Sequence, residues 1–205
     1  MKYSGLFFCL IVCLSSNSFS QSFNANIIAG VSTTQISGDQ LSGFDKAGIL
    51  LGGGVSTALN NDWEIEMQMT YMQKGSRKNA RPDKNDFDYY LLRLNYFEVP
   101  LLFNYTQADK MRFEVGPSFG VLLSSFEENE EGEYIGRTKF EDFDLSLNIG
   151  MMYSFIENLY VNTRFSNSVL KVRDHGSGAA DRLNKGQYNM VLLFGLKYYI
   201  PKTSQ

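Results

Sequence analysis

The only histidine of the chain lies in the stretch RDHGSG, beside residue types that occur together in hydrolytic triads. His175 is flanked by Asp174 and Ser177. A working triad must be oriented in space so that the histidine can take a proton from the serine hydroxyl. A glycine-rich segment is a poor scaffold for that geometry. We therefore expect His175 to be a solvated loop residue and the protein not to be an enzyme.

Two charged stretches have the composition of ion-binding loops. FEENEEGEYIGR (residues 126–137) offers carboxylate oxygens of the kind that bind Ca²⁺, but it lacks the D-x-D-x-D-G spacing of a dedicated calcium loop. SRKNARPDK (residues 76–84) could contact anionic lipid headgroups or a protein partner. Its basic residues are Arg77, Lys78, Arg81 and Lys84. We interpret both stretches as polar surface loops and expect neither a metal ion nor a cofactor.

A third candidate lies in the apolar stretch YFEVPLLFNYT (residues 96–106), which contains Glu98 and Pro100. A buried carboxylate needs a partner, and a proline removes one hydrogen bond from a β-ladder. Glu98 could bind a ligand or gate a path, but the interpretation we favour is an inward-facing acid held in an ion pair. The candidate partners are Arg93, Arg112 and Arg164.

The positions of the charges along this segment predict an irregularity in the strand. Arg93 stands at an odd position and Glu98 at an even one, and side chains alternate between the two faces of a strand. For both residues to face one polar interior, the alternation must slip between Tyr96 and Phe97. The pattern therefore predicts a β-bulge at this point.

The N-terminal segment has the pattern of a secretory signal peptide. Lys2 precedes a short apolar core at Leu6–Leu14, and small residues follow, so we expect residues 1–20 to be removed after Ser20. Both cysteines, Cys9 and Cys13, lie in this segment. Lipidation of Cys13 is the alternative, although the preceding Val12 is bulky. The mature chain, residues 21–205, would then be a single domain without cysteine, mildly acidic and without the basic stripe of a nucleic-acid-binding protein.

The mature chain shows apolar residues at every second position in many segments, which is typical of β-strands with two different faces. No segment after the N-terminus is long and apolar enough for a transmembrane helix. The pattern predicts eight strands, at about residues 23–36, 47–59, 62–75, 89–106, 110–125, 140–155, 158–170 and 187–200.

The connections between these strands alternate regularly between long and short. Short connections such as Asn60-Asn61 have turn chemistry, whereas the long connections are polar and charged. All long loops would then lie at one end and all tight turns at the other. This arrangement is typical of transmembrane β-barrels, which have short periplasmic turns and long extracellular loops. We therefore predict an all-β fold, an eight-stranded antiparallel up-and-down transmembrane barrel.

Three features favour a bilayer over a soluble, lipocalin-like barrel. The predicted strands of about 13 to 18 residues are longer than the usual five or six. Mixed charges crowd the polar faces and would pair in the lumen, namely Glu64, Glu66, Arg93, Glu98, Arg112, Glu114, Asp142, Asp144, Arg164 and Lys197. Aromatic residues cluster near the strand ends like an interfacial girdle. They are Trp63, Tyr105, Phe113, Tyr153, Phe155 and Tyr198 at the short-turn end, and Tyr71, Phe143 and Tyr188 at the long-loop end.

Three segments resemble the outer-membrane β-barrel proteins known as the porin family or PorT-like proteins. They are NYFEVPLLFNY, FEVGPSFGVLLSS and the terminal LLFGLKYYI. The resemblance extends over about Phe23 to Ile200. It implies an eight-stranded barrel in the outer membrane of a Gram-negative bacterium, inserted by the barrel-insertion machinery.

From these patterns we expect an integral barrel of structural, adhesive or partner-docking type, with a charge-filled lumen and no catalytic activity. An eight-stranded barrel is just wide enough for side chains to fill it. The alternatives are a small-solute channel and, implied by the resemblance, an accessory role in protein export. The expected partners are outer-membrane lipids, the insertion machinery during biogenesis and a protein reached through the long loops.

Overall fold

The computed structural model describes residues 22–39, 41, 43–108, 110–133, 138–174 and 186–201. The predicted signal peptide lies outside these residues, so its cleavage after Ser20 and the lipidation of Cys13 stay predictions. Within the described part, no helix is long and apolar enough to cross a membrane. One 3₁₀ turn, η1 (Pro82–Lys84), interrupts an otherwise all-β structure.

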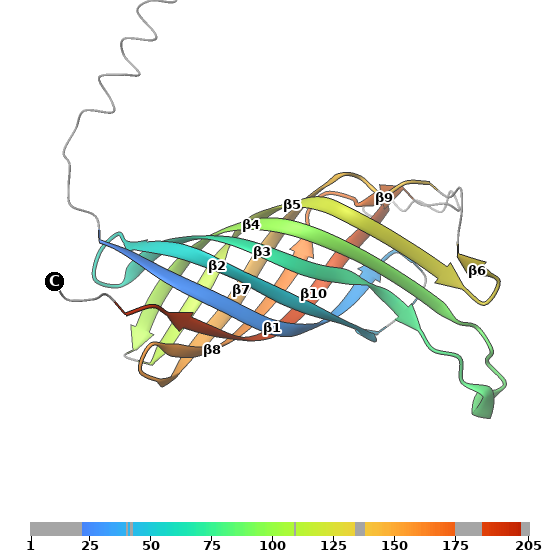
Figure 1. Cartoon of the computed structure of the whole chain (residues 1–205), viewed down its shortest axis with the longest axis horizontal. Coiled ribbons are helices and arrows are strands. Elements are labelled where there is room, and N and C mark those ends of the chain that lie inside the picture. The colour runs from blue at the N-terminus through green and yellow to red at the C-terminus, as the bar shows by residue number, and fades with distance from the viewer. Residues whose placement is uncertain are drawn as a thin grey trace, which may run out of the picture.

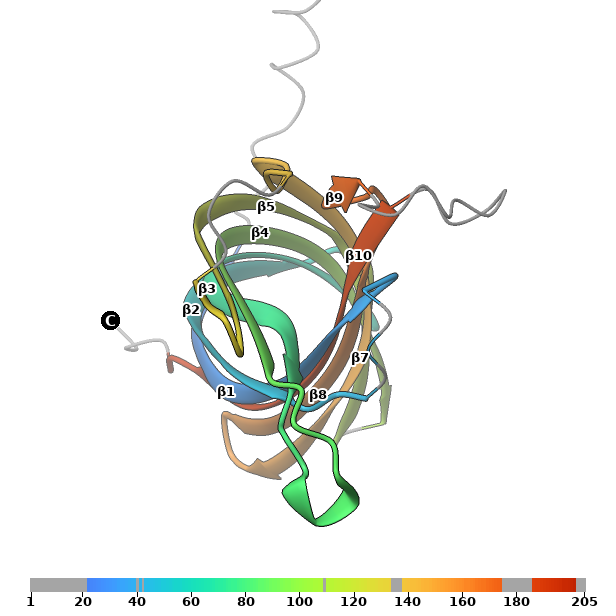
Figure 2. The same cartoon turned by 90° about the vertical axis from the view of Figure 1, so that its right-hand side faces the viewer.

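Eight long antiparallel strands form a closed barrel (Figures 1 and 2). Each pairs with its neighbour in the chain, and the first strand also pairs with the last, which closes the sheet. The predicted fold is therefore confirmed. The strands are β1 (Phe23–Ser37), β2 (Lys46–Ala58), β3 (Trp63–Lys78), β4 (Tyr90–Ala108), β5 (Met111–Asn129), β7 (Phe143–Ile156), β8 (Leu159–Ser168) and β10 (Gly186–Tyr199), with the short strands β6 (Gly132–Glu133) and β9 (Arg173–Asp174) beside β5 and β10.

Short turns gather at one end of the barrel, where β1 starts and β10 ends (Figure 1). In the β2–β3 turn, the Asn60 side-chain oxygen accepts hydrogen bonds of 2.9 Å from the backbone N–H groups of Asp62 and Trp63. In the β7–β8 turn, Asn158 has a φ of 63°, a left-handed conformation that asparagine tolerates well. These local bonds let adjacent strands reverse within a few residues.

The outer wall of the barrel has an apolar belt of exposed side chains. In β4 the belt runs from Phe97 to Tyr105, in β5 from Phe113 to Leu123 and in β7 from Phe143 to Tyr153. Each range is close to the roughly 9–11 tilted residues that cross the hydrocarbon core of a bilayer. A water-soluble protein would not leave such a continuous apolar surface uncovered.

β3, β4 and β5 continue past this belt at the long-loop end (Figure 1). Beyond the belt, the outer face of β4 carries Asn95 and Arg93, whereas its inner face becomes apolar. Leu92, Leu94 and Tyr96 of β4 pack with Ile36 inside the upper barrel, and all four are fully buried. The outward-facing side chains there meet headgroups and water instead of lipid tails.

The predicted slip of the alternation within β4 is wrong, although a register shift lies one residue from the predicted position. Alternate residues of β4 from Leu92 through Glu98 to Asn104 all face inward without a slip. The register does shift opposite Asn95 and Tyr96, but the extra residue is Leu123 on β5. Since the outer face of β4 is polar above the belt, a charge can face outward there, and no slip is needed to accommodate it.

Two prolines interrupt the ladders without changing the register. β3 and β4 pair on both sides of Val99 and Pro100 but not at these two residues. β4 and β5 likewise miss the pairs opposite Gly116 and Pro117. Because proline has no N–H to donate, each gap lies where a ladder bond could not form. Pro100 is therefore tolerated in the barrel wall at the expense of local pairing.

Candidate functional site: charged layers inside the barrel

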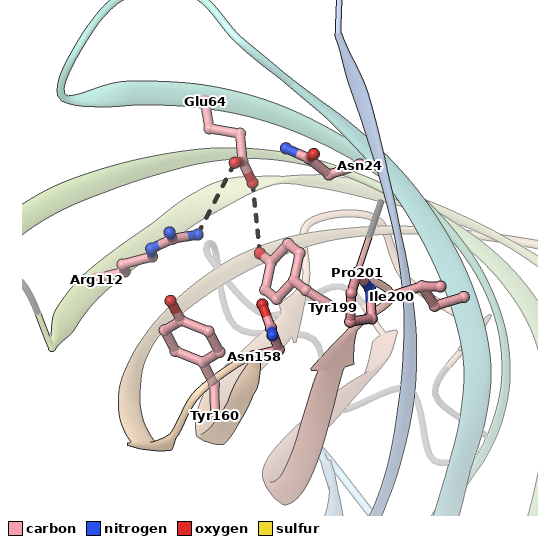
Figure 3. A pocket seen from close by; sticks show the side chains of 8 residues that line it. All are labelled: Asn24, Glu64, Arg112, Asn158, Tyr160, Tyr199, Ile200 and Pro201. Carbon is pink, nitrogen blue, oxygen red and sulfur yellow. Dashed lines mark hydrogen bonds and ion pairs between the residues drawn. The ribbon is translucent and has the colours of Figure 1, made fainter. Parts of the chain in front are cut away.

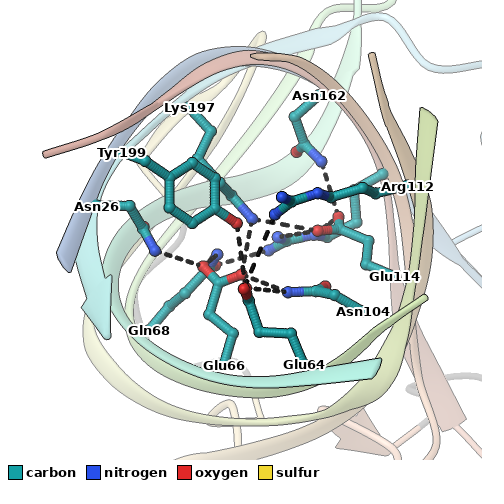
Figure 4. A network of polar contacts seen from close by, with 11 residues as sticks. Asn26, Glu64, Glu66, Gln68, Asn104, Arg112, Glu114, Asn162, Lys197 and Tyr199 are labelled. Carbon is teal, nitrogen blue, oxygen red and sulfur yellow. Dashed lines mark hydrogen bonds and ion pairs between the residues drawn. The ribbon is translucent and has the colours of Figure 1, made fainter. Parts of the chain in front are cut away.

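A network of four charged side chains crosses the middle of the barrel (Figure 4). Lys197 of β10 lies with its Nζ 3.0 Å from Glu66 Oε2 of β3 and 3.4 Å from Glu114 Oε2 of β5. Arg164 of β8 donates to Glu114 through Nε at 2.6 Å and through Nη2 at 3.2 Å. Four strands therefore contribute one charge each, and cations and carboxylates are equal in number.

Side-chain amides satisfy the remaining oxygens of the two acids. Glu66 accepts hydrogen bonds from Asn26 at 3.0 Å, Gln68 at 2.6 Å and Asn104 at 2.8 Å. Glu114 accepts one from Asn162 at 2.9 Å. Buried carboxylates are tolerated only with such partners. Each oxygen of the two acids therefore has protein donors, which leaves the acids no open position for a metal or a substrate.

A second layer lies nearer the long-loop end and contains Glu98. Lys74 of β3 lies 2.5 Å from Glu98 Oε1 and 2.9 Å from Asp144 Oδ2, and its Nζ is 5.0 Å from the centre of the Tyr96 ring. Asn189 also donates to Asp144 at 2.8 Å. The partner of Glu98 is thus Lys74, and the expectation of an arginine partner is wrong. In the alternating pattern of β3, Lys74 falls on the same polar face as Glu64 and Glu66. This pattern could have identified Lys74 as an inward-facing partner for Glu98.

The periplasmic mouth holds the loosest pair, beside a polar hollow of about 200 Å³ (Figure 3). Arg112 Nη1 lies 3.8 Å from Glu64 Oε2, and the Tyr199 hydroxyl donates to Glu64 at 3.4 Å. The guanidinium of Arg112 lies 4.9 Å and 5.4 Å from the ring centres of Tyr160 and Tyr199. The rings of Tyr160 and Tyr199 therefore contact the Arg112 guanidinium at the mouth of the barrel.

A further buried ion pair, at the extracellular end, was not predicted from the sequence. Arg173 of β9 binds Glu127 of β5 through Nη1 at 2.6 Å and donates from Nε to Gln187 at 2.8 Å. The Tyr90 hydroxyl donates to Glu127 at 2.7 Å, and the Arg173 guanidinium lies 4.2 Å from the Phe140 ring centre. Arg173 and Glu127 are far apart in the sequence and lie at loop margins, where alternation predicts little.

Apolar clusters separate the charged layers along the barrel axis. Met152 packs with Tyr160 and Tyr199 near the mouth. A second cluster fills the space above the central network, and a third contains Leu92, as described above. The members of the second cluster are Ile28, Leu50, Met72, Val191 and Leu193. Buried apolar clusters therefore lie in the lumen beside the predicted charges.

Of the ten charged residues predicted to face the lumen, the structure places eight inside the barrel. Arg93 faces outward above the belt, 6.0 Å from the Phe126 ring centre, since β4 alternates without a slip. Asp142 is exposed because it lies just before β7, which begins at Phe143, and outside the last ladder pair of β5 and β7. These two placements correct the prediction for Arg93 and Asp142.

The nine aromatic residues predicted to form a girdle all lie on the outer wall, although Tyr71 and Tyr188 are partly covered. Trp63 and Tyr105 face each other across β3 and β4 with ring centres 5.0 Å apart. The Tyr71 hydroxyl donates to Asn95 at 3.0 Å at the upper edge of the belt. Their contact with the membrane interface stays a prediction.

The loop candidates show surface chemistry where the structure describes them. Lys78 binds Asp86 at 3.1 Å and Asp88 at 2.8 Å, which raises the pKa of Lys78 and lowers that of Asp86. Asp174 pairs with Lys171 at 2.5 Å. His175, Ser177 and residues 134–137 lie outside the described residues.

No metal-binding group of three or more acidic, histidine or cysteine residues occurs in the described part of the chain. The sequence Gly116-Pro117-Ser118-Phe119-Gly120 has the G-x-S-x-G spacing of a nucleophile elbow, a match that the sequence reasoning missed. A nucleophile elbow is a sharp strand-to-helix turn. Here the five residues lie in the middle of β5, with Ser118 buried in the barrel wall. The match therefore has no structural context for nucleophilic catalysis.

Known proteins provide an independent comparison. The family model described as "Outer membrane protein beta-barrel domain" matches residues 16–174. No curated protein matches the chain. Among solved structures, Neisserial surface protein A has a TM-score of 0.55 at 11% identity, over 85% of this chain and 96% of its own. The attachment invasion locus protein Ail of Yersinia pestis has a TM-score of 0.52 at 11% identity, over 86% and 98%. At this identity the likeness concerns the fold.

Proposed function

We propose that this chain, which belongs to the family of outer membrane protein β-barrel domains, is a non-enzymatic barrel that docks a partner at its extracellular end. It is a transmembrane protein of the outer membrane. The proposal concerns the role of the barrel in that membrane. A structural and partner-docking or adhesive role is favoured over a channel, because side chains fill the interior and the extracellular strands project beyond the membrane.

The central network is the observation that carries the proposal. The side chains of Glu66 and Lys197 are each 0% exposed, and that of Arg164 is 4% exposed. A conducting lumen needs a continuous water path past this layer. Apolar clusters above and below the network, at Leu193 and at Met152, add further obstacles to such a path.

Opening the lumen would require separating buried charges from their partners. Such pairs are held in a low-dielectric interior, where the attraction between opposite charges is stronger than in water. The interior contains several such pairs, which include Lys197 with Glu66, Arg164 with Glu114 and Lys74 with Glu98. These pairs support a monomer whose lumen stays closed.

The extracellular end supports docking because it extends far from the membrane. β3, β4 and β5 continue past the apolar belt, and the β3–β4 connection reaches further through η1 (Figure 2). Phe87 in this connection is exposed, which is typical of a residue available for contact. An ordered platform with an exposed loop can present side chains to a partner without a large entropy loss.

Planar-bilayer recordings test the closed lumen. The purified chain, folded in detergent and inserted into a bilayer, should give no stable conductance steps, whereas an open porin in the same bilayer provides the positive control. Large, reproducible single-channel steps from the folded monomer would refute the proposal and favour the small-solute channel.

Loop replacement tests the docking role. Residues 79–88 are replaced by a short Gly-Ser connection, and the control variant instead carries a Gly-Ser turn at residues 59–62 on the periplasmic end. In cross-linked outer membranes, the first variant should lose the cross-linked partner and the control should keep it. Both should retain heat-modifiable gel migration as a sign of folding. A partner that stays cross-linked to the first variant would contradict docking through this loop.

A further inference from the structure

The hollow at the periplasmic mouth has a positive and a negative side chain next to each other in its wall. Its volume is about 200 Å³, and Figure 3 shows Arg112, Glu64 and Tyr199 turned toward one another beside it. The amide side chains of Asn24 and Asn158 also line it. Pockets for drug-sized ligands have volumes of about 300–1,000 Å³, so this hollow suits a smaller polar group.

The two charged groups at the mouth are bonded less tightly than the charges deeper in the barrel. Arg112 Nη1 lies 3.8 Å from Glu64 Oε2, which is beyond hydrogen-bond distance. The hydrogen bonds that Glu64 accepts are long, at 3.3 Å from Asn104 and 3.4 Å from Tyr199. In the central network, by contrast, the shortest hydrogen bonds measure 2.6 Å. The charged pair at the mouth therefore keeps bonding capacity that the central network has already used.

Both charged groups are accessible to a ligand and are held in position by the barrel. The Arg112 side chain is 24% exposed and the Glu64 side chain 14% exposed, whereas the Lys197 side chain in the central network is 0% exposed. The ring centres of Tyr160 and Tyr199 lie 4.9 Å and 5.4 Å from the Arg112 guanidinium. Because these rings already orient the guanidinium, binding of a further ligand costs little conformational freedom.

We propose that this hollow binds a zwitterionic α-amino acid group, with the carboxylate of the ligand on Arg112 and its ammonium on Glu64. A planar guanidinium binds the two oxygens of a carboxylate through parallel hydrogen bonds. A carboxylate alone would be repelled by Glu64, and an ammonium alone would be repelled by Arg112. A group with both charges on one carbon atom meets an opposite charge on each side.

The ligand enters and leaves on the periplasmic side. The next inward-facing residues of the same three strands, Glu66, Glu114 and Lys197, form the central network. A ligand in the hollow therefore needs no open lumen. The site also lies at the end of the barrel opposite the proposed docking loop, so amino-acid binding and partner docking hold or fail independently. Two periplasmic sources carry the same group, namely free amino acids and the diamino-acid ends of cell-wall peptides.

The test compares three small molecules that differ in their charged groups. Alanine carries both charges, propionate lacks the ammonium and ethylamine lacks the carboxylate. Each is titrated into the folded full chain in detergent micelles, and the NMR signals of isotope-labelled Tyr160 and Tyr199 report binding in the hollow. Alanine should bind at least about tenfold more tightly than either analogue, since a hydrogen bond to a charged group contributes that much or more.

Two substitutions assign the two charges of the ligand. Arg112→Gln should weaken alanine binding by about tenfold or more. Glu64→Gln should weaken alanine binding but strengthen propionate binding, because it removes the negative charge that repels a carboxylate. The matched control is Lys110→Gln, which removes an exposed positive charge at the same end of the barrel and should bind alanine like wild type. All three variants should keep heat-modifiable gel migration.

The proposal is overturned if wild type binds propionate as tightly as alanine, or if Lys110→Gln loses as much affinity as Arg112→Gln. If Arg112→Gln does not fold, the opposite effects of Glu64→Gln on the two ligands still decide the question. A soluble cell-wall peptide that contains diaminopimelate then identifies the source. Displacement of alanine by this peptide supports a cell-wall ligand, and binding of alanine alone supports a free amino acid. Unchanged tyrosine signals with both ligands refute the site.

Discussion

Replacing Lys197 with methionine tests whether the central layer is a coupled network of buried charges. Lys197 is fully buried and its Nζ lies between Glu66 at 3.0 Å and Glu114 at 3.4 Å. Methionine keeps most of the volume of the side chain and removes its charge. Packing should therefore change little, and the consequence should be electrostatic.

The size of the effect follows from what each acid retains. Glu114 keeps Arg164 at 2.6 Å, whereas Glu66 keeps only the amide donors of Asn26, Gln68 and Asn104. Removal of one partner from a buried pair is destabilising by about 3–5 kcal/mol. Because three neutral donors still stabilise Glu66, we expect a loss near the lower limit, about 3 kcal/mol.

A second substitution separates the charge effect from a packing effect. Combining Lys197→Met with Glu66→Gln removes the uncompensated carboxylate, and replacing both members of a buried pair by neutral groups is often close to neutral. The double variant should therefore regain most of the lost stability. The control Lys78→Met removes a lysine from an exposed ion pair with Asp86 and should leave stability unchanged.

Urea unfolding of the protein reconstituted in lipid vesicles provides the assay. Trp63 is the only tryptophan and is partly exposed on the outer wall, so its fluorescence reports the loss of the lipid environment. Heat-modifiable gel migration provides a second probe of the same transition. If the double variant is as unstable as Lys197→Met alone, the interpretation of an electrostatic network is wrong.

Two further predictions concern the barrel wall. Gly116→Ala should destabilise the barrel by about 1–3 kcal/mol in the same urea assay, because its Cβ would collide with the Leu101 carbonyl, whereas Gly53→Ala should be tolerated better. An equal loss in both would contradict the close approach of β4 and β5. In a chain expressed without residues 1–20, which hold both cysteines, Arg93→Cys should react with a membrane-impermeant maleimide and Leu94→Cys should not. Preferential labelling at Leu94→Cys would restore the predicted slip in β4.

The strand set could be predicted from the sequence because a barrel wall separates two solvents. Lipid tails on one side and a filled interior on the other impose a period of two on every spanning strand, from Phe113 in β5 to Tyr198 in β10. Loop polarity and turn chemistry then set the order of long and short connections. These signals are local, so a single chain displays them without any knowledge of distant contacts.

The alternation rule, in which outward residues are apolar and inward residues are polar, failed where the outer face of a strand leaves the lipid tails. Arg93 was predicted to face inward because lipid tails exclude charge, but β4 continues past the belt, and there the outer face is polar. The height at which a strand leaves the hydrocarbon core depends on the whole barrel. No local pattern in β4 records that height.

Only the tertiary structure decided which charges meet. Lys74 pairs with Glu98 and Asp144, and Arg173 pairs with Glu127, across separations that alternation does not specify. The alternation of a strand determines which face a side chain takes, whereas the tilt and stagger of the closed barrel determine its height along the axis. Two inward charges form a pair only when those heights coincide, and that condition is a property of the closed sheet as a whole.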